Sequence, residues 1–159
     1  MDSHTPSDSP PLLERRLPPL LRKAWFGLNQ AFRQRINPVG LTPDQFSVLR
    51  WISESPEGIL TQTEITTAMA SDPNTIASLV RRMEHSGLIT RGQHARDARA
   101  KAVTLTQKGR EALQTASEIA IALQNSVLTC LPASRRDTFI ADLLTVGEAC
   151  QAANRSNPR

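Results

Sequence analysis

The chain has 159 residues, of which 39% are hydrophobic and only 4% aromatic, and its net charge is +4. This length suits one domain with its own core, and the scarcity of aromatic side chains favours packed helices over a β-sandwich or barrel. The charge is unevenly spread, because residues 81–110 hold eight Lys and Arg against only Glu84 and Asp97. Such a local basic excess is typical of a surface that contacts nucleic acid.

Simple sequence features disfavour several classes of protein. No apolar run approaches the roughly 20 residues of a membrane span, and residues 1–16 lack the pattern of a signal peptide. We therefore expect a cytoplasmic protein with no membrane partner, and a disordered tail over these Ser- and Pro-rich residues. Cys130 and Cys150 lie far apart and the 3 histidines are scattered, so neither a disulfide framework nor a metal site is indicated.

The first predicted helix runs from residue 17 to residue 36. Its apolar side chains recur at three- and four-residue steps, as expected for one side of a helix, and the Asn-Pro-Val-Gly sequence at 37–40 ends it. The apolar stripe is wide for one helix of a small domain. We expect part of it to face a second subunit.

Two further helices are predicted before residue 71. One covers 42–54, with Thr42 as its cap. Residues 59–60 read as a short extended piece that could pair with a later hairpin. Thr61 and Glu64 then form a capping box, which begins a helix of about two and a half turns.

A fourth helix is predicted over 73–86, with Asp72 as its cap and Gly87 at its stop. Two short helices joined by a tight turn form a helix-turn-helix. Helical periodicity places apolar residues on one side, namely Ile76, Leu79, Val80 and Met83. The opposite side carries polar and basic residues, namely Asn74, Ser78, Arg81 and His85, flanked by Thr75 and Arg82.

The remaining segments predict a hairpin and two long helices. Residues 88–91 and 102–105 read as strands around a basic turn, which makes a β-hairpin "wing". Thr106 caps a helix over 107–129, where Gly109 in the first turn indicates close packing. A last helix follows Pro132, with an inner side formed by Phe139, Ile140, Leu143, Leu144 and Gly147.

These elements assemble into a mainly α fold with a small β wing. A winged helix-turn-helix lobe over 41–106 lies within a single domain over 17–151, flanked by helices at 17–40 and 107–151. Residues 152–159 are expected to fray.

At this point the sequence resembles the MarR family of winged helix-turn-helix regulators, over nearly the whole chain. The most specific matches are Gly-Leu-x-x-Arg at 87–91, Asp-x-Arg at 97–99 and Leu-Thr-x-x-Gly at 105–109. Leu-Thr-Pro-Asp-Gln-Phe at 41–46 is similar to the start of the family's second helix.

The resemblance implies a homodimer held together by the first and the last two helices. Recognition helices would enter successive major grooves of double-stranded DNA, and wings would reach the minor groove. It also implies a repressor of a pseudo-palindromic operator, released by a small effector such as a phenolic or aromatic acid. Some members instead sense oxidants through a cysteine.

The best candidates for reading bases are Asn74, Thr75, Ser78 and Arg81, because the N-terminal half of a recognition helix meets base edges. Arg82 is a candidate phosphate contact. The alternative is an ordinary solvated helix side.

In the wing, Arg99 is the candidate for the minor groove, where narrow A·T tracts concentrate negative potential. Arg96, Lys101 and Arg91 are candidates for nonspecific phosphate attraction. Asp97 would repel phosphate, so we expect it to pair with a nearby Arg and shape the wing.

The sequence also predicts an effector site. Arg22, Trp25, Phe46 and Arg50 could line a crevice in which an Arg meets a carboxylate, although Trp25 also suits a core or dimer interface. Cys130, close in sequence to Arg135 and Arg136, is a candidate redox sensor, and Cys150 is expected on the inner side of the last helix.

Two other functions compete with a DNA-binding regulator. One is a winged-helix module that binds proteins and has no DNA role, which the basic wing disfavours. The other is an enzyme, but the sequence has no triad, carboxylate pair or glycine-rich phosphate loop. We therefore expect no catalytic residues and no cofactor.

Overall fold

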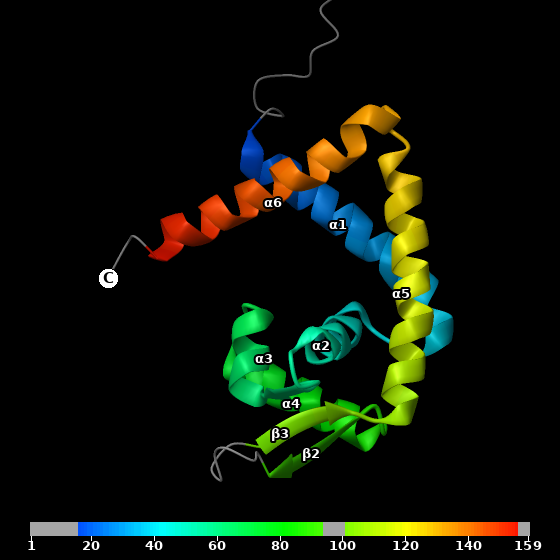
Figure 1. The fold of residues 1–159 in the computed structure, drawn as a ribbon, viewed down its shortest axis with the longest axis vertical. Coiled ribbons are helices and arrows are strands. Elements are labelled where there is room, and N and C mark those ends of the chain that lie inside the picture. The colour runs from blue at the N-terminus through cyan, green and yellow to red at the C-terminus, as the bar shows by residue number, and fades with distance from the viewer. Residues whose placement is uncertain (1–15, 94–100, 156–159) are drawn as a thin grey trace, which may run out of the picture. The chain divides into compact units, whose positions relative to one another are not determined.

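The structure is a computed structural model that describes residues 16–93 and 101–155. It confirms the mainly α fold with a small β sheet (Figure 1). In chain order its elements are α1 (Leu17–Ile36), the 3-10 helix η2 (Asn37–Val39), α2 (Pro43–Glu54), β1 (Ile59–Thr61), α3 (Gln62–Ala68), α4 (Pro73–His85), β2 (Ile89–Gln93), β3 (Lys101–Leu105), α5 (Gln107–Leu128) and α6 (Ala133–Arg155). Among the described helices, none is both long and apolar enough to cross a membrane.

The three strands form one antiparallel sheet in the order β1-β3-β2. β3 is central: Thr104 pairs with Ile59 of β1 on one side and with Thr90 of β2 on the other. The predicted pairing of the short extended piece with the hairpin is therefore confirmed. Because β1 leads directly into α3, the sheet ties the helix-turn-helix to the hairpin.

The chain forms two compact units, the first ending at Ile119 and the second beginning at Ala120. The first unit contains the winged-helix lobe together with α1 and the N-terminal half of α5. The second contains the rest of α5 and α6. The division at residues 106 and 107, between a lobe and dimerisation helices, stays a prediction.

Side chains that satisfy backbone N–H groups start three of the helices where the sequence places them. Thr42 and Gln45 form a capping box at α2, and Thr61 and Glu64 form one at α3. Asp72 accepts hydrogen bonds from the backbone N–H groups of Asn74 and Thr75 at α4. These caps satisfy backbone groups that have no partner within the helix.

The first unit has an aliphatic core drawn from α1, α2, α3, α4 and the sheet. Its largest fully buried side chains are Ile36, Val48, Leu49, Ile52, Ile65, Ile76, Val80, Met83, Ile89 and Val103. The whole predicted apolar side of the fourth helix is buried. No polar or charged residue is buried among the described residues.

The prediction that the last helix has a buried inner side is wrong for the single chain. Leu144 is 65% exposed, and Phe139, Ile140 and Leu143 are also exposed. Cys150 is exposed as well. These apolar side chains are exposed in the described chain, so their apolar character needs another explanation.

The start of α5 packs closely on the turn that follows α4. The Thr106 hydroxyl donates to the carbonyls of Gly87 and Leu88 at 2.7 and 3.1 Å, and it accepts from the Gly109 N–H at 2.9 Å. A Cβ atom at Gly109 would lie 2.0 Å from the Leu88 carbonyl oxygen. The predicted Thr106 cap and the close packing at Gly109 are both confirmed.

We expect Gly109→Ala to destabilise the fold by about 1–3 kcal/mol, because the new methyl group must displace backbone. Urea unfolding measures this change. Gly92→Ala is the matched control: a Cβ there meets nothing within 4 Å, so the effect should stay within about 0.5 kcal/mol. Equal stability of the two variants would contradict the close contact.

Candidate nucleic-acid interface

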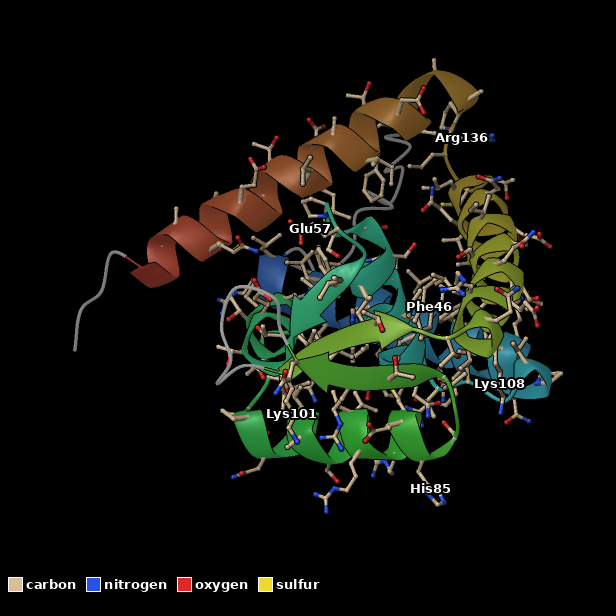
Figure 2. All side chains as sticks on the ribbon, turned by 60° about the horizontal axis from the view of Figure 1, so that its bottom comes forward. Phe46, Glu57, His85, Lys101, Lys108 and Arg136 are labelled. Carbon is tan, nitrogen blue, oxygen red and sulfur yellow. The ribbon has the colours of Figure 1, made fainter. Side chains whose placement is uncertain are left out.

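The outer side of α4 is a continuous polar and basic surface. Asn74, Thr75, Arg81 and Arg82 are exposed, and Ser78 is half-buried. Figure 2 shows His85 at the end of α4, pointing away from the sheet. The orientation follows from packing, because burial of the four apolar residues on the other side leaves this side facing solvent.

The N-terminus of α4 is held by Asp72. Its carboxylate lies 3.0 and 2.9 Å from the backbone nitrogens of Asn74 and Thr75. Hydrogen bonding from the Thr75 side chain, and then from its backbone N–H, lowers the pKa of Asp72. Thr75 therefore takes part in the cap, which leaves Asn74, Ser78 and Arg81 as the less constrained side chains for reading bases.

The turn before this helix contains an unusual backbone conformation. Ala70 has a φ of 47°, in the left-handed region that glycine adopts more readily than alanine. The Ala70 N–H donates to the Thr67 carbonyl at 3.1 Å, and the Ser71 N–H donates to the Thr66 carbonyl at 3.3 Å. The turn is thus closed by hydrogen bonds, and it sets the direction in which α4 leaves α3.

Arg91 has an intramolecular partner that sequence reasoning missed. Its Nε donates to Oε2 of Glu84 at 2.8 Å, and a second guanidinium nitrogen contacts the same oxygen. These hydrogen bonds lower the pKa of Glu84 and raise that of Arg91. In place of the free cation expected for phosphate attraction, the structure shows an ion pair, formed because the turn at Gly87 brings β2 back along α4.

Other basic residues of this region remain available. Within residues 16–93 and 101–155, Arg81, Arg82 and Lys101 take part in no ion pair. Lys101 is exposed at the start of β3, opposite Gln93. Arg96, Asp97 and Arg99, the predicted wing residues, lie outside the described residues.

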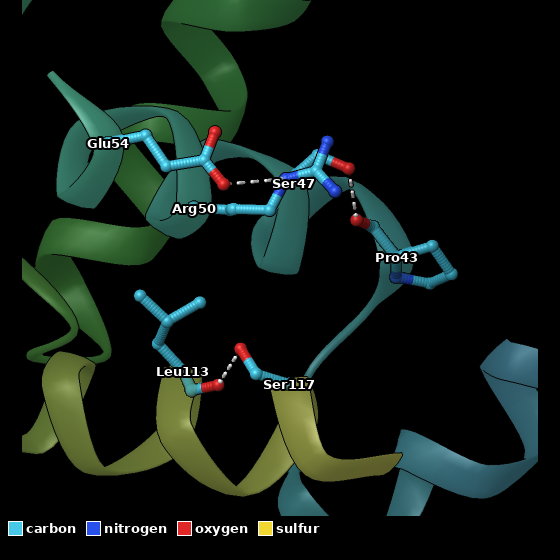
Figure 3. A network of polar contacts seen from close by, with 6 residues as sticks. All are labelled: Pro43, Ser47, Arg50, Glu54, Leu113 and Ser117. Carbon is cyan, nitrogen blue, oxygen red and sulfur yellow. Dashed lines mark hydrogen bonds and ion pairs between the residues drawn. The ribbon is translucent and has the colours of Figure 1, made fainter. Parts of the chain in front are cut away.

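The predicted effector residues lie on two helices. On α2, Phe46 is a core residue whose ring meets that of Phe32 edge-on, with centroids 4.9 Å apart. The Arg50 guanidinium lies 6.0 Å from the Phe46 ring centroid and 5.8 Å from that of Trp51, and it forms an ion pair with Glu54 at 3.7 Å (Figure 3).

On α1, Arg22 is exposed and Trp25 is 65% exposed. Trp25 is therefore not a core residue, and the dimer interface and the effector site remain as its predicted roles. Cys130 is exposed. The described residues contain no cluster of His, Cys, Asp and Glu that could hold a metal ion.

Comparison with known proteins gives the family. A sequence profile of the MarR family matches residues 41–101, a range that contains α2, β1, the helix-turn-helix of α3 and α4, and β2. The chain is 31% identical to the transcriptional regulator HosA of Escherichia coli over 126 residues, covering 76% of this chain and 92% of HosA. The chain belongs to the MarR family.

Solved structures agree with this family membership. The transcriptional repressor CouR, bound to a 23-mer DNA duplex, is 29% identical with a TM-score of 0.76, and the match covers 85% of this chain and 94% of CouR. The M. tuberculosis regulator MOSR in complex with DNA is 34% identical with a TM-score of 0.64, covering 82% and 95% of the two chains. This MarR-family chain thus has the fold of transcriptional regulators.

The Asp72 cap should make stability depend on pH. A carboxylate with a lowered pKa stabilises the folded state above its ordinary pKa of 3.8, and this contribution is lost as pH falls through the lowered value. Asp72→Ala should therefore lower the melting temperature at pH 7, and the deficit should shrink below pH 3.8.

Thermal unfolding across pH 2–8 checks this expectation. Asp72→Asn is the control, because asparagine caps helices about as well as aspartate but carries no charge. If Asp72→Ala lowers the melting temperature by the same amount at every pH, the charge of Asp72 contributes nothing to stability.

Proposed function

We propose that this MarR-family chain is a sequence-specific transcriptional regulator that binds double-stranded DNA as a homodimer and represses from a pseudo-palindromic operator. The observation that carries this proposal is the exposed polar and basic side of a capped α4, placed beside a hairpin. Its size and composition suit the major groove, which admits one α-helix.

Each predicted contact type has a physical basis. Arg81 is suited to bidentate hydrogen bonds with guanine O6 and N7, and Asn74 to adenine. Arg82 and Lys101, without ion-pair partners among the described residues, supply phosphate attraction that weakens with salt. Arg96 and Arg99 remain the proposed wing contacts, with Asp97 shaping the wing.

The dimer is proposed from the exposed apolar side chains of the terminal helices. Trp25 and Phe26 of α1 are 65% and 60% exposed, and Leu144 of α6 is 65% exposed. In the second unit, α5 and α6 also border a hollow of about 430 Å³, lined in part by Leu128, Ile140 and Leu144. Burying such surface against a second copy is favourable, and a two-fold dimer predicts half-sites about one helical turn apart.

An effector that releases the DNA is part of the proposal. A small phenolic or aromatic acid would use an Arg for its carboxylate and aromatic rings for its body, and Arg22, Trp25, Phe46 and Arg50 are the proposed residues. A second mode of release is oxidation of Cys130, which is exposed as a redox-active thiol must be.

Footprinting on the DNA that flanks the protein's own gene tests the function directly. Protection of two half-sites at about 150 mM salt supports the proposal, and loss of protection with an aromatic acid or an oxidant identifies the releasing signal. Retained binding to a protein partner with no affinity for duplex DNA would instead favour a protein-interaction module.

Arg81→Ala should weaken operator binding about 10- to 100-fold, because the loss of one bidentate base contact removes discrimination at that base pair. Fluorescence anisotropy with operator and with scrambled duplex measures both affinities. Arg81→Lys is the control, since it keeps the charge but loses the bidentate geometry. Full operator affinity in both variants would remove Arg81 from base reading.

Leu144→Asp should weaken the dimer, because a buried unpaired carboxylate is costly at an apolar interface. Size-exclusion chromatography with light scattering over a range of concentrations measures the effect. Thr138→Asp adds the same charge at an exposed polar position of α6, and it should leave the dimer intact. A wild-type chain that is monomeric at micromolar concentration would overturn the dimer.

A further inference from the structure

The ion pair between Glu84 and Arg91 connects two elements that a DNA-binding lobe must hold at a set angle. Glu84 lies in the last turn of α4, three residues after Arg81, so the two side chains are neighbours on the helix surface. Arg91 is the central residue of β2, paired with Val103 of β3. The pair therefore joins the recognition helix to the middle of the hairpin.

The geometry of the pair is directional. Two guanidinium nitrogens of Arg91 meet the same Glu84 oxygen, with the Nε at 2.8 Å. Contact through two nitrogens fixes the orientation of the planar guanidinium as well as its distance. A shift of the hairpin along or away from α4 would break at least one of these hydrogen bonds.

Stability alone does not explain the pair. The two side chains are 35% and 26% exposed, so solvent screens their attraction and the gain in folding free energy is small. The hairpin base is already held by the buried side chains of Leu88 and Ile89 and by the hydrogen bonds of Thr106 to the carbonyls of Gly87 and Leu88.

Charge alone does not explain it either. An acidic residue beside Arg81 lowers the attraction of α4 for phosphate, so a surface selected only for positive charge would not carry Glu84. Arg91, and more weakly Lys101, offset that charge. The remaining explanation is that the contact of Glu84 with Arg91 orients the hairpin relative to α4.

We propose that Glu84 and Arg91 are a positioning pair that sets the angle between the recognition helix and the wing, so that both engage one operator half-site together. This inference rests on the proposed DNA binding. Neither residue needs to touch DNA for this role. It predicts that loss of the pair lowers discrimination between operator and other DNA, rather than affinity for DNA in general.

Glu84→Ala removes both the charge and the hydrogen-bond acceptor of Glu84, and the two losses change operator binding in opposite directions. Loss of a negative charge near phosphate would tighten binding to every duplex. Loss of positioning raises the operator Kd about tenfold, the size typical of coupled neighbours, and leaves the Kd for scrambled duplex unchanged or lower. Glu111→Ala is the matched control: it makes the same charge change on α5, where the Glu111 side chain accepts a hydrogen bond from Gln107 at 2.8 Å.

The reversed pair, Glu84→Arg combined with Arg91→Glu, keeps the net charge and restores opposite charges. It should recover most of the operator discrimination lost in Glu84→Ala. Two footprints add a readout that mere destabilisation would not change. In hydroxyl-radical footprinting Glu84→Ala should lose minor-groove protection at the wing position, while protection of guanine N7 from dimethyl sulfate in the major groove persists. Equal thermal unfolding midpoints confirm that the variants are folded.

The outcomes distinguish failure of the proposed function from failure of the positioning pair. If wild-type protein does not distinguish operator from scrambled duplex, the proposed function fails. If wild-type protein does, and Glu84→Ala keeps the same ratio of affinities and the same minor-groove protection, the positioning pair is overturned while the function stands. A Glu84→Ala variant that binds all duplexes more tightly, with an unchanged ratio, also overturns it.

Discussion

The burial of one side of α4 is the constraint on which the candidate site depends. Ile76, Val80 and Met83 are almost completely buried, and their spacing fixes the rotation of the helix about its axis. Once that rotation is set, Asn74 and Arg81 must face solvent. The outward direction of the proposed base-reading side is thus a consequence of core packing and needs no further interaction.

The position of α4 also depends on where the helix starts and ends. Its start is set by the Asp72 cap, and its end by the turn at Gly87, where α5 contacts the Leu88 carbonyl through Thr106. The absence of a side chain at Gly109 permits that approach. Because α5 continues into the second unit, the same contact joins the end of the recognition helix to the element that leads into the proposed dimer region.

The single chain leaves large apolar side chains of α1 and α6 exposed. The first unit buries a core of aliphatic residues, while Trp25 and Leu144 are each 65% exposed. Exposed apolar surface of this kind marks an interaction site in soluble proteins. The wide apolar stripe seen in the sequence therefore supports the proposed homodimer.

The sequence by itself determined the element order, the caps and the outer side of α4, because periodicity and capping are local properties of the chain. It also carried the family motifs, including Gly109. Only the tertiary structure decided that Arg91 pairs with Glu84 and that the apolar residues of α6 are exposed. Each of these depends on which surfaces meet after the chain turns back on itself, and residue spacing does not encode that.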